Sequence, residues 1–135
     1  MVLWKHVLSA VLVAGALWAA APGVRADQTD PVLDALFAAL TATKNPAEAA
    51  EIEKRIWQTW AVTGQELVDS AMARGVIAMN KGAFETALKY FNDVLSLAPE
   101  HAEGWNKRAT VYFLLGNYPE SVLDIQRTLE LEPRH

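Results

Sequence analysis

The side chains that most often do chemistry are sparse in this chain of 135 residues, which has three histidines and no cysteine. His6, His101 and His135 lie far apart in the sequence, and none has a second metal ligand at helical spacing. Paired acids such as Glu51 and Glu53 fit a solvated helix face better than a catalytic carboxylate pair. The sequence therefore predicts a protein that is not an enzyme, with no metal site and no cofactor.

Two segments of the chain, residues 82–99 and 116–133, are similar in sequence. Each begins with glycine, has an aromatic residue two positions later, and ends with proline. Small and bulky apolar residues also agree in class between the two segments. A fixed period of about 34 residues is typical of stacked helical repeats.

Helix start and stop signals divide the chain from residue 30 onward. Asp30 followed by proline predicts one helix start, and Asn45 followed by Pro46 predicts the next. Gly64 is expected to end that second helix. We expect four further helices at about 65–80, 84–97, 102–115 and 119–132. Short loops between helices favour antiparallel hairpins.

On the frame set by the shift from Gly82 to Gly116, the chain resembles the tetratricopeptide repeat family. The second unit begins at Ala102 and carries family-type residues at Trp105, Ala109, Tyr112, Gly116, Tyr118, Ser121, Ile125 and Pro133. The first clear unit begins at Val68 and carries Gly75, Ala78, Gly82, Phe84, Ala87, Phe91 and Pro99. The resemblance implies an all-α fold: a right-handed α-solenoid of antiparallel helix hairpins, with one degenerate and two clear repeats.

The expected domains follow from these units. Residues 1–26 are predicted to be a cleaved signal peptide, and residues 27–66 a degenerate hairpin that acts as an N-terminal cap. Residues 67–135 would hold the two clear repeats, 68–101 and 102–135.

The segment 1–26 has the order of a secretory signal peptide. Lys5 and His6 precede an apolar run over 7–21, and small residues stand at Val24 and Ala26. An uncleaved anchor is the alternative, but this run is shorter than the ~20 residues that span a bilayer. We expect cleavage, no stable membrane span afterwards, and a periplasmic or secreted product. With the repeats, this resembles exported tetratricopeptide proteins of Gram-negative bacteria.

Charge argues against nucleic acid as a partner. The full chain has a net charge of −4 from 12 basic and 16 acidic residues. Loss of Lys5 and Arg25 with the signal leaves 10 basic against 16 acidic residues, or −6. An acidic surface without a basic run repels phosphate backbones.

In tetratricopeptide proteins, the first helix of each hairpin lines a concave groove that holds a protein or peptide. The resemblance implies a non-catalytic binding scaffold, here in the bacterial envelope. Its groove positions would be Asp69, Met72, Val76, Met79, Glu103, Asn106, Thr110 and Phe113. Methionine and phenylalanine suit an amphipathic peptide. The basic carboxylate clamp of chaperone-binding members is not matched, because Val76 stands where that clamp has asparagine.

A self-assembling structural module is the alternative function. The last repeat would leave apolar residues without a following helix, and a homodimer could form through this uncapped C-terminal face. The residues of that face are Leu115, Val122, Ile125 and Leu129. A chain shortened from a longer array would expose the same face.

One pair of residues departs from the family pattern. Arg74 and Arg108 replace leucine at position seven of the two units, either as ligand-binding arginines or as structural ones. The structural interpretation is favoured, with Asp124 placed to receive Arg108.

Trp57 and Trp60 share one face of the predicted second helix. We expect them to pack against the first helix, Leu67 and Ala71. An exposed pair would instead mark a second binding surface.

Overall fold

The structure is a computed structural model that describes residues 31–135, so the predicted signal peptide over 1–26 lies outside the described residues. Within this range every regular element is a helix. The helices are α1 (Pro31–Ala42), α2 (Pro46–Ala61), α3 (Glu66–Asn80), α4 (Phe84–Leu97), α5 (Ala102–Leu114) and α6 (Tyr118–Leu131). The predicted all-α fold is confirmed.

Glycine and proline set the helix boundaries. Gly64, Gly82 and Gly116 have φ values of 73°, 73° and 78°, a left-handed conformation that side chains with a Cβ rarely adopt. Pro46 occupies the first turn of α2, and the backbone N–H of Ala47 donates to Asn45 Oδ1 at 3.0 Å. The turns before Pro46 and at Gly82 and Gly116 bring the two helices of each hairpin back against one another, whereas the turn at Gly64 does not lay α3 along α2.

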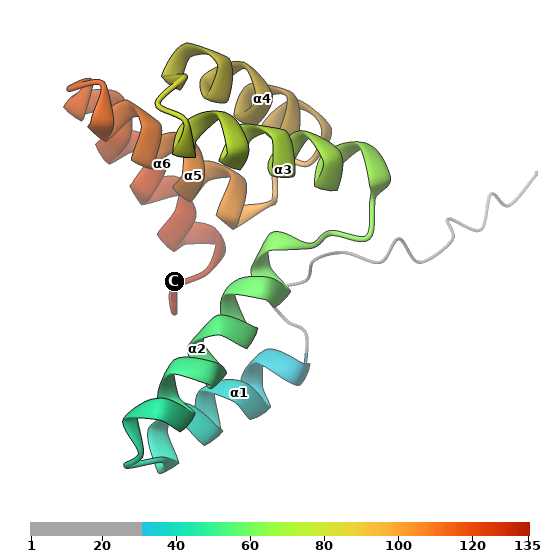
Figure 1. Ribbon diagram of the computed structural model, residues 1–135, viewed down its shortest axis with the longest axis vertical. Helices are drawn as coiled ribbons and strands as arrows, with labels where there is room; N and C mark the ends of the chain where they lie inside the picture. Colours follow the sequence, from blue (N-terminus) through green and yellow to red (C-terminus); the bar gives the residue numbers. More distant parts are fainter. Residues whose placement is uncertain (1–30) are drawn as a thin grey trace, which may run out of the picture.

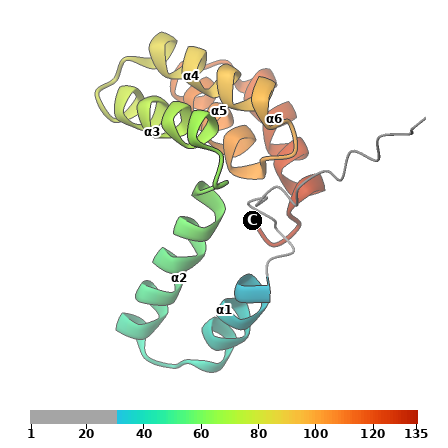
Figure 2. The ribbon, with the colours of Figure 1, turned by 90° about the vertical axis from the view of Figure 1, so that its right-hand side faces the viewer.

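Helices α3 to α6 form a stack of two hairpins (Figures 1 and 2). Each of the pairs α3–α4 and α5–α6 packs closely, and α4 also packs on α5. Phe91 lies fully buried at the centre of this stack, in one cluster with Val68, Val94 and Val111. A Cβ added to Gly75 would lie 2.5 Å from Phe91 Cε1. The backbone of α3 therefore approaches the Phe91 ring at a point that only glycine allows.

The α1–α2 hairpin packs differently. It has a small core of its own, made of Leu33, Leu36, Ile52, Ile56 and Trp60. Its main contact with the stack is between α2 and α5 rather than between α2 and α3. Figures 1 and 2 show the hairpin projecting away from the stack, with the C-terminus beside α2. A regular array would instead place α2 next to α3, which follows it in sequence.

The expected packing of the tryptophan pair is partly wrong. Trp60 is buried and contacts Phe37 of α1 at 5.9 Å between ring centroids, as expected. Its other face stacks on the ring of His135 at 4.4 Å, whereas Leu67 is 72% exposed. Trp57 is also partly exposed. The reason is that α2 lies beside the C-terminal end of the chain instead of along α3.

Replacing Gly75 with alanine tests the close approach to Phe91. Alanine favours a helix by about 1 kcal/mol over glycine, but overpacking costs about 1–3 kcal/mol or more. We expect Gly75→Ala to lower the free energy of unfolding, measured by urea denaturation. Ser70→Ala, an exposed change on the same helix, should stay within about 0.5 kcal/mol. Equal stability of both variants and the parent chain would contradict this packing.

Candidate functional site

Helix α3 contributes little free surface at the predicted groove positions. Met72 is buried in the core of the stack, and Val76 and Met79 pack half-buried against that core. The carboxylate of Asp69 accepts hydrogen bonds from the backbone N–H and the hydroxyl of Thr63, both at 2.7 Å. Asp69 therefore fixes the turn between α2 and α3.

The predicted groove residues of α5 that remain accessible surround a hollow of about 170 Å³ between α5 and α6. Asn106, Thr110 and Phe113 line it together with Ile125, and we call it the α5–α6 hollow. Phe113 is 60% exposed, and its ring lies 5.5 Å from that of Tyr118. The hollow thus joins exposed aromatic surface to an amide and a hydroxyl.

Glu103 lies in the interior instead of facing a groove. Its side chain is 2% exposed. Its carboxylate meets Lys107 Nζ at 2.9 Å, Asn106 Nδ2 at 3.0 Å and His135 Nε2 at 2.9 Å. Burial by itself raises the pKa of Glu103, but the interactions with His135, Lys107 and Asn106 outweigh it and lower that pKa. Glu103 is therefore an ionised, internally satisfied group.

The segment 132–135 forms what we call the C-terminal turn, and it connects α6 to the α1–α2 hairpin. Arg134 Nη1 lies 2.6 Å from Asp34 Oδ1, and its guanidinium sits over the Phe37 ring at 4.8 Å. The ring of His135 stacks on Trp60 while its Nε2 contacts Glu103. The turn therefore bridges α1, α2 and α5.

Sequence reasoning missed the C-terminal turn. His135 and Glu103 are separated by 32 residues, and Arg134 and Asp34 by 100. Neither separation belongs to a helical period or to the period of the repeat. A partial signal was present, because Lys107 follows Glu103 at the i,i+4 spacing at which opposite charges pair on a helix.

His101 is a second buried titratable group, at the N-terminus of α5. Burial lowers its pKa, although the nearby carboxylates of Glu103 and Asp69 act in the opposite direction. Its Nε2 is buried without a hydrogen-bond partner among residues 31–135. A charged ring there would lose hydration without a compensating bond, so His101 is neutral at pH 7.

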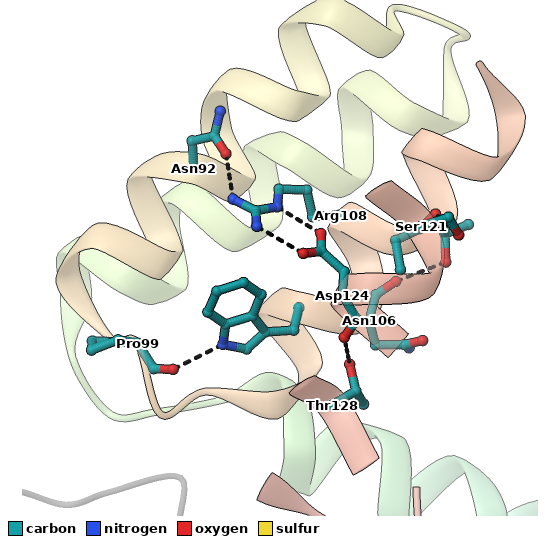
Figure 3. A network of polar contacts seen from close by, with 10 residues as sticks. Asn92, Pro99, Asn106, Arg108, Ser121, Asp124 and Thr128 are labelled. Atoms are coloured by element: carbon teal, nitrogen blue, oxygen red, sulfur yellow. Dashed lines mark hydrogen bonds and ion pairs between the residues drawn. The ribbon is translucent and has the colours of Figure 1, made fainter. Parts of the chain in front are cut away.

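The structural interpretation of Arg108 is confirmed (Figure 3). Its Nε and Nη2 donate to the two oxygens of Asp124 at 2.7 and 2.8 Å, and its Nη1 donates to Asn92 Oδ1 at 2.8 Å. The guanidinium also lies 4.8 Å from the Trp105 ring. Arg108 thereby ties α5 to both α6 and α4. Arg74, its counterpart, is exposed and makes no such bond within the described part of the chain.

The predicted C-terminal face is mostly exposed. Val122, Ile125 and Leu129 of α6 are 53%, 44% and 46% exposed, whereas Leu115 packs half-buried against the core of the stack. Three of the four residues therefore form an apolar strip along α6.

Neither a metal cluster nor a membrane-spanning helix occurs in the described part of the chain. Residues 31–135 contain no group of three or more histidine or acidic side chains that could hold a metal ion. None of the helices in this range is long and apolar enough to span a bilayer.

The two arginines provide a matched test of the Arg108 network. Arg108→Ala leaves the carboxylate of Asp124, which is 4% exposed, without its partner. We expect a loss of about 3 kcal/mol in the free energy of unfolding. Arg74→Ala removes the same side chain one repeat earlier and should change it by less than about 0.5 kcal/mol in dilute solution. Equal effects in urea denaturation would contradict the assignment.

The lowered pKa of His101 makes stability depend on pH. Below its ordinary value of 6.5 the unfolded chain takes up a proton that the folded chain does not. The free energy of unfolding should therefore fall as pH drops below 6.5, until the folded-state pKa is passed. In the variant His101→Leu, the free energy of unfolding should decrease less with falling pH when urea denaturation is repeated from about pH 8 to pH 5. Parallel pH profiles for variant and parent would contradict the assignment.

Comparisons with known proteins agree with the repeat geometry. The sequence model of the tetratricopeptide repeat family matches residues 68–101, which cover α3 and α4. A TPR repeat-containing protein of Rhizobium etli is 35% identical over 103 residues, which cover 76% of this chain and 50% of that protein. Among solved structures, none matches the chain significantly.

Two further relatives belong to eukaryotes. Hsp70-Hsp90 organizing protein 1 of Glycine max is 31% identical over 109 residues, or 77% of this chain and 19% of that protein. The Tetratricopeptide repeat protein 36 homolog of Nematostella vectensis is 32% identical over 108 residues, which cover 77% of this chain and 58% of that protein. The chain thus spans half of the Rhizobium protein and about a fifth of the Glycine max protein. Residues 68–101 form a tetratricopeptide repeat, and the comparisons support placing the chain in the tetratricopeptide repeat family.

Proposed function

We propose that the chain is a non-catalytic scaffold that binds a partner protein at the α5–α6 hollow. The observation that carries this proposal is the exposure of Phe113 beside Asn106, Thr110 and Ile125. Exposed aromatic residues next to polar groups are typical anchors of protein interfaces. A peptide or helix with an apolar face would cover Phe113 and Ile125 and donate to the carbonyl oxygen of Asn106, whose Nδ2 already donates to Glu103.

The size of the hollow supports a peptide rather than a small molecule. Pockets that bury drug-sized ligands usually measure about 300–1,000 Å³, whereas this one measures about 170 Å³. It offers room for one or two side chains of a longer ligand. The rest of such a ligand would lie along the exposed surface of α5 and α6.

The charges of the site argue against capture of a terminal carboxylate. The two basic residues of α5 are already paired: Lys107 with Glu103 at 2.9 Å, and Arg108 with Asp124 at 2.7 Å. Val76 packs against the core and offers no amide. Some relatives are named Hsp70-Hsp90 organizing proteins, but the basic residues of α5 are already engaged with carboxylates of this chain. The proposed ligand is therefore an internal amphipathic segment.

We place this scaffold in the bacterial envelope. The proposal rests on the signal-like order of residues 1–26 and on the acidic balance of the remaining residues. In that setting the chain would act after export, as a periplasmic or secreted protein.

Self-assembly is a second candidate function. The exposed strip of Val122, Ile125 and Leu129 on α6 favours it, because neighbouring apolar side chains on one helix face gain from being covered. Such association would make the chain a structural module, either as a homodimer or as a larger assembly.

Affinity capture from a bacterial envelope extract tests the first candidate. We expect a protein to be retained by the parent chain and lost by the double variant Asn106→Ala, Phe113→Ala. The control is Gln58→Ala, Val62→Ala, which removes another exposed amide and apolar side chain that do not line the hollow. This control should retain the same protein.

Circular dichroism must show unchanged helicity in both double variants. Retention of the protein by the Asn106→Ala, Phe113→Ala variant at the level of the parent would contradict binding at the hollow. Loss of the protein from both double variants would contradict it equally, because the interaction would then not depend on this site.

A further inference from the structure

We propose that copies of this chain associate head to tail, with α6 of one copy packed against α3 and α4 of the next. The inference deepens the second candidate function and rests on it. It names the acceptor surface for the apolar strip of α6, and it predicts an open chain of copies instead of a symmetric dimer.

The contact between α4 and α5 inside the chain provides the template. A Cβ on Gly104 of α5 would lie 2.9 Å from Val94 and 3.0 Å from Leu95 of α4, so the two backbones approach closely there. One turn further along, Arg108 donates to Asn92. This internal interface therefore combines close apolar packing with one polar bond that fixes its register.

Helix α6 repeats the α4 side of this interface. The shift that maps Gly82 onto Gly116 also maps Leu88, Phe91, Asn92 and Leu95 onto Val122, Ile125, Gln126 and Leu129. Phe91 and Leu95 are 0% and 7% exposed inside the stack, whereas Ile125 and Leu129 are 44% and 46% exposed. Apolar residues and an amide are thus present and uncovered at these positions of α6, whereas Val94 corresponds to Thr128, which is polar and 2% exposed.

Helix α3 corresponds, one repeat earlier, to α5, which forms the other side of the α4–α5 contact. A hollow of about 420 Å³ lies between α3 and α4, lined among others by Leu67, Ala71 and Arg74. Ile77 of α3 is the counterpart of Val111, one repeat later. Val111 is fully buried in the stack, whereas Ile77 is 54% exposed. This end of the stack is therefore an uncovered surface with apolar residues at positions that correspond to the buried ones of α5. Ser70 replaces Gly104 there, so α6 would lie farther from α3 than α4 lies from α5.

A polar pair fixes the same register between copies. The internal bond joins Arg108 to Asn92, and the frame maps these residues to Arg74 and Gln126. Both counterparts are exposed. In the proposed contact, Arg74 would donate to the amide oxygen of Gln126 of the second copy.

The chain's own α2 fits the acceptor less well than α6 does. At the positions of Leu88 and Leu95, α2 has Lys54 and Ala61, so a charge replaces one apolar contact and a methyl group replaces another. Helix α2 is also already packed against α5. A second copy of the chain is therefore the occupant that the residues favour.

Two different faces meet in this contact, so each copy keeps one face free after pairing. Such heterologous contacts build open chains unless the rotation happens to close a ring. The mass of the assembly should therefore grow past that of a dimer as the concentration rises.

Sedimentation velocity on three proteins tests the proposal. Leu129→Glu places a charge on the proposed contact surface of α6, and Ile77→Glu places one on that of α3. Both substitutions are at exposed positions outside the α5–α6 hollow. Each variant alone should remain a monomer at concentrations where the parent assembles. An equal mixture of the two should form dimers and nothing larger, because one intact interface is restored.

Leu123→Glu is the matched control, since Leu123 is exposed on α6 and corresponds to Lys89, which is also exposed. It should assemble like the parent. If Leu129→Glu dissociates the assembly but Ile77→Glu does not, self-assembly stands and the head-to-tail contact is overturned. A parent chain that stays monomeric at every concentration overturns both, and the capture experiment at the hollow is unaffected.

Discussion

The position of the α1–α2 hairpin relative to the stack of α3 to α6 depends on the contacts of the buried Glu103 carboxylate. A buried charge is tolerated only when other groups replace its lost hydration. Two of its partners, Asn106 and Lys107, lie on the same helix, but the third is His135 at the end of the chain. The C-terminal turn is thereby held against α5, and the stacking of His135 on Trp60 holds α2 beside it.

This arrangement explains why the α3–α4 end of the stack is uncovered. Because α2 lies near α5, it does not cover the outer side of α3 and α4, where a hollow of about 420 Å³ remains. At the other end no helix among the described residues covers the apolar strip of α6. Residues of α5 that follow Glu103 remain accessible, and they line the α5–α6 hollow. The uncovered surface of α3 and α4 thus follows from the position of the α1–α2 hairpin.

Local signals in the sequence predicted the helices and the repeat, and could not predict the contacts around Glu103. Glycine at 82 and 116 must adopt positive φ, so the hairpin turns were readable directly. The pair of Arg108 and Asp124 was also readable, because both residues belong to one repeat. The family pattern placed Glu103 on a groove, yet its partner His135 lies 32 residues away and outside any period. Such contacts depend on where the α1–α2 hairpin docks, which periodicity does not encode.

A nuclear Overhauser spectrum of the chain tests most directly whether the C-terminal turn holds the α1–α2 hairpin. We expect cross-peaks between the ring protons of His135 and the indole protons of Trp60, because the two ring centroids lie 4.4 Å apart. Cross-peaks between Phe91 and Gly75 would show in the same sample that the stack is folded. A spectrum with the Phe91 contacts and without any contact between His135 and Trp60 would contradict this role of the C-terminal turn, because the turn would then not hold the α1–α2 hairpin against α5.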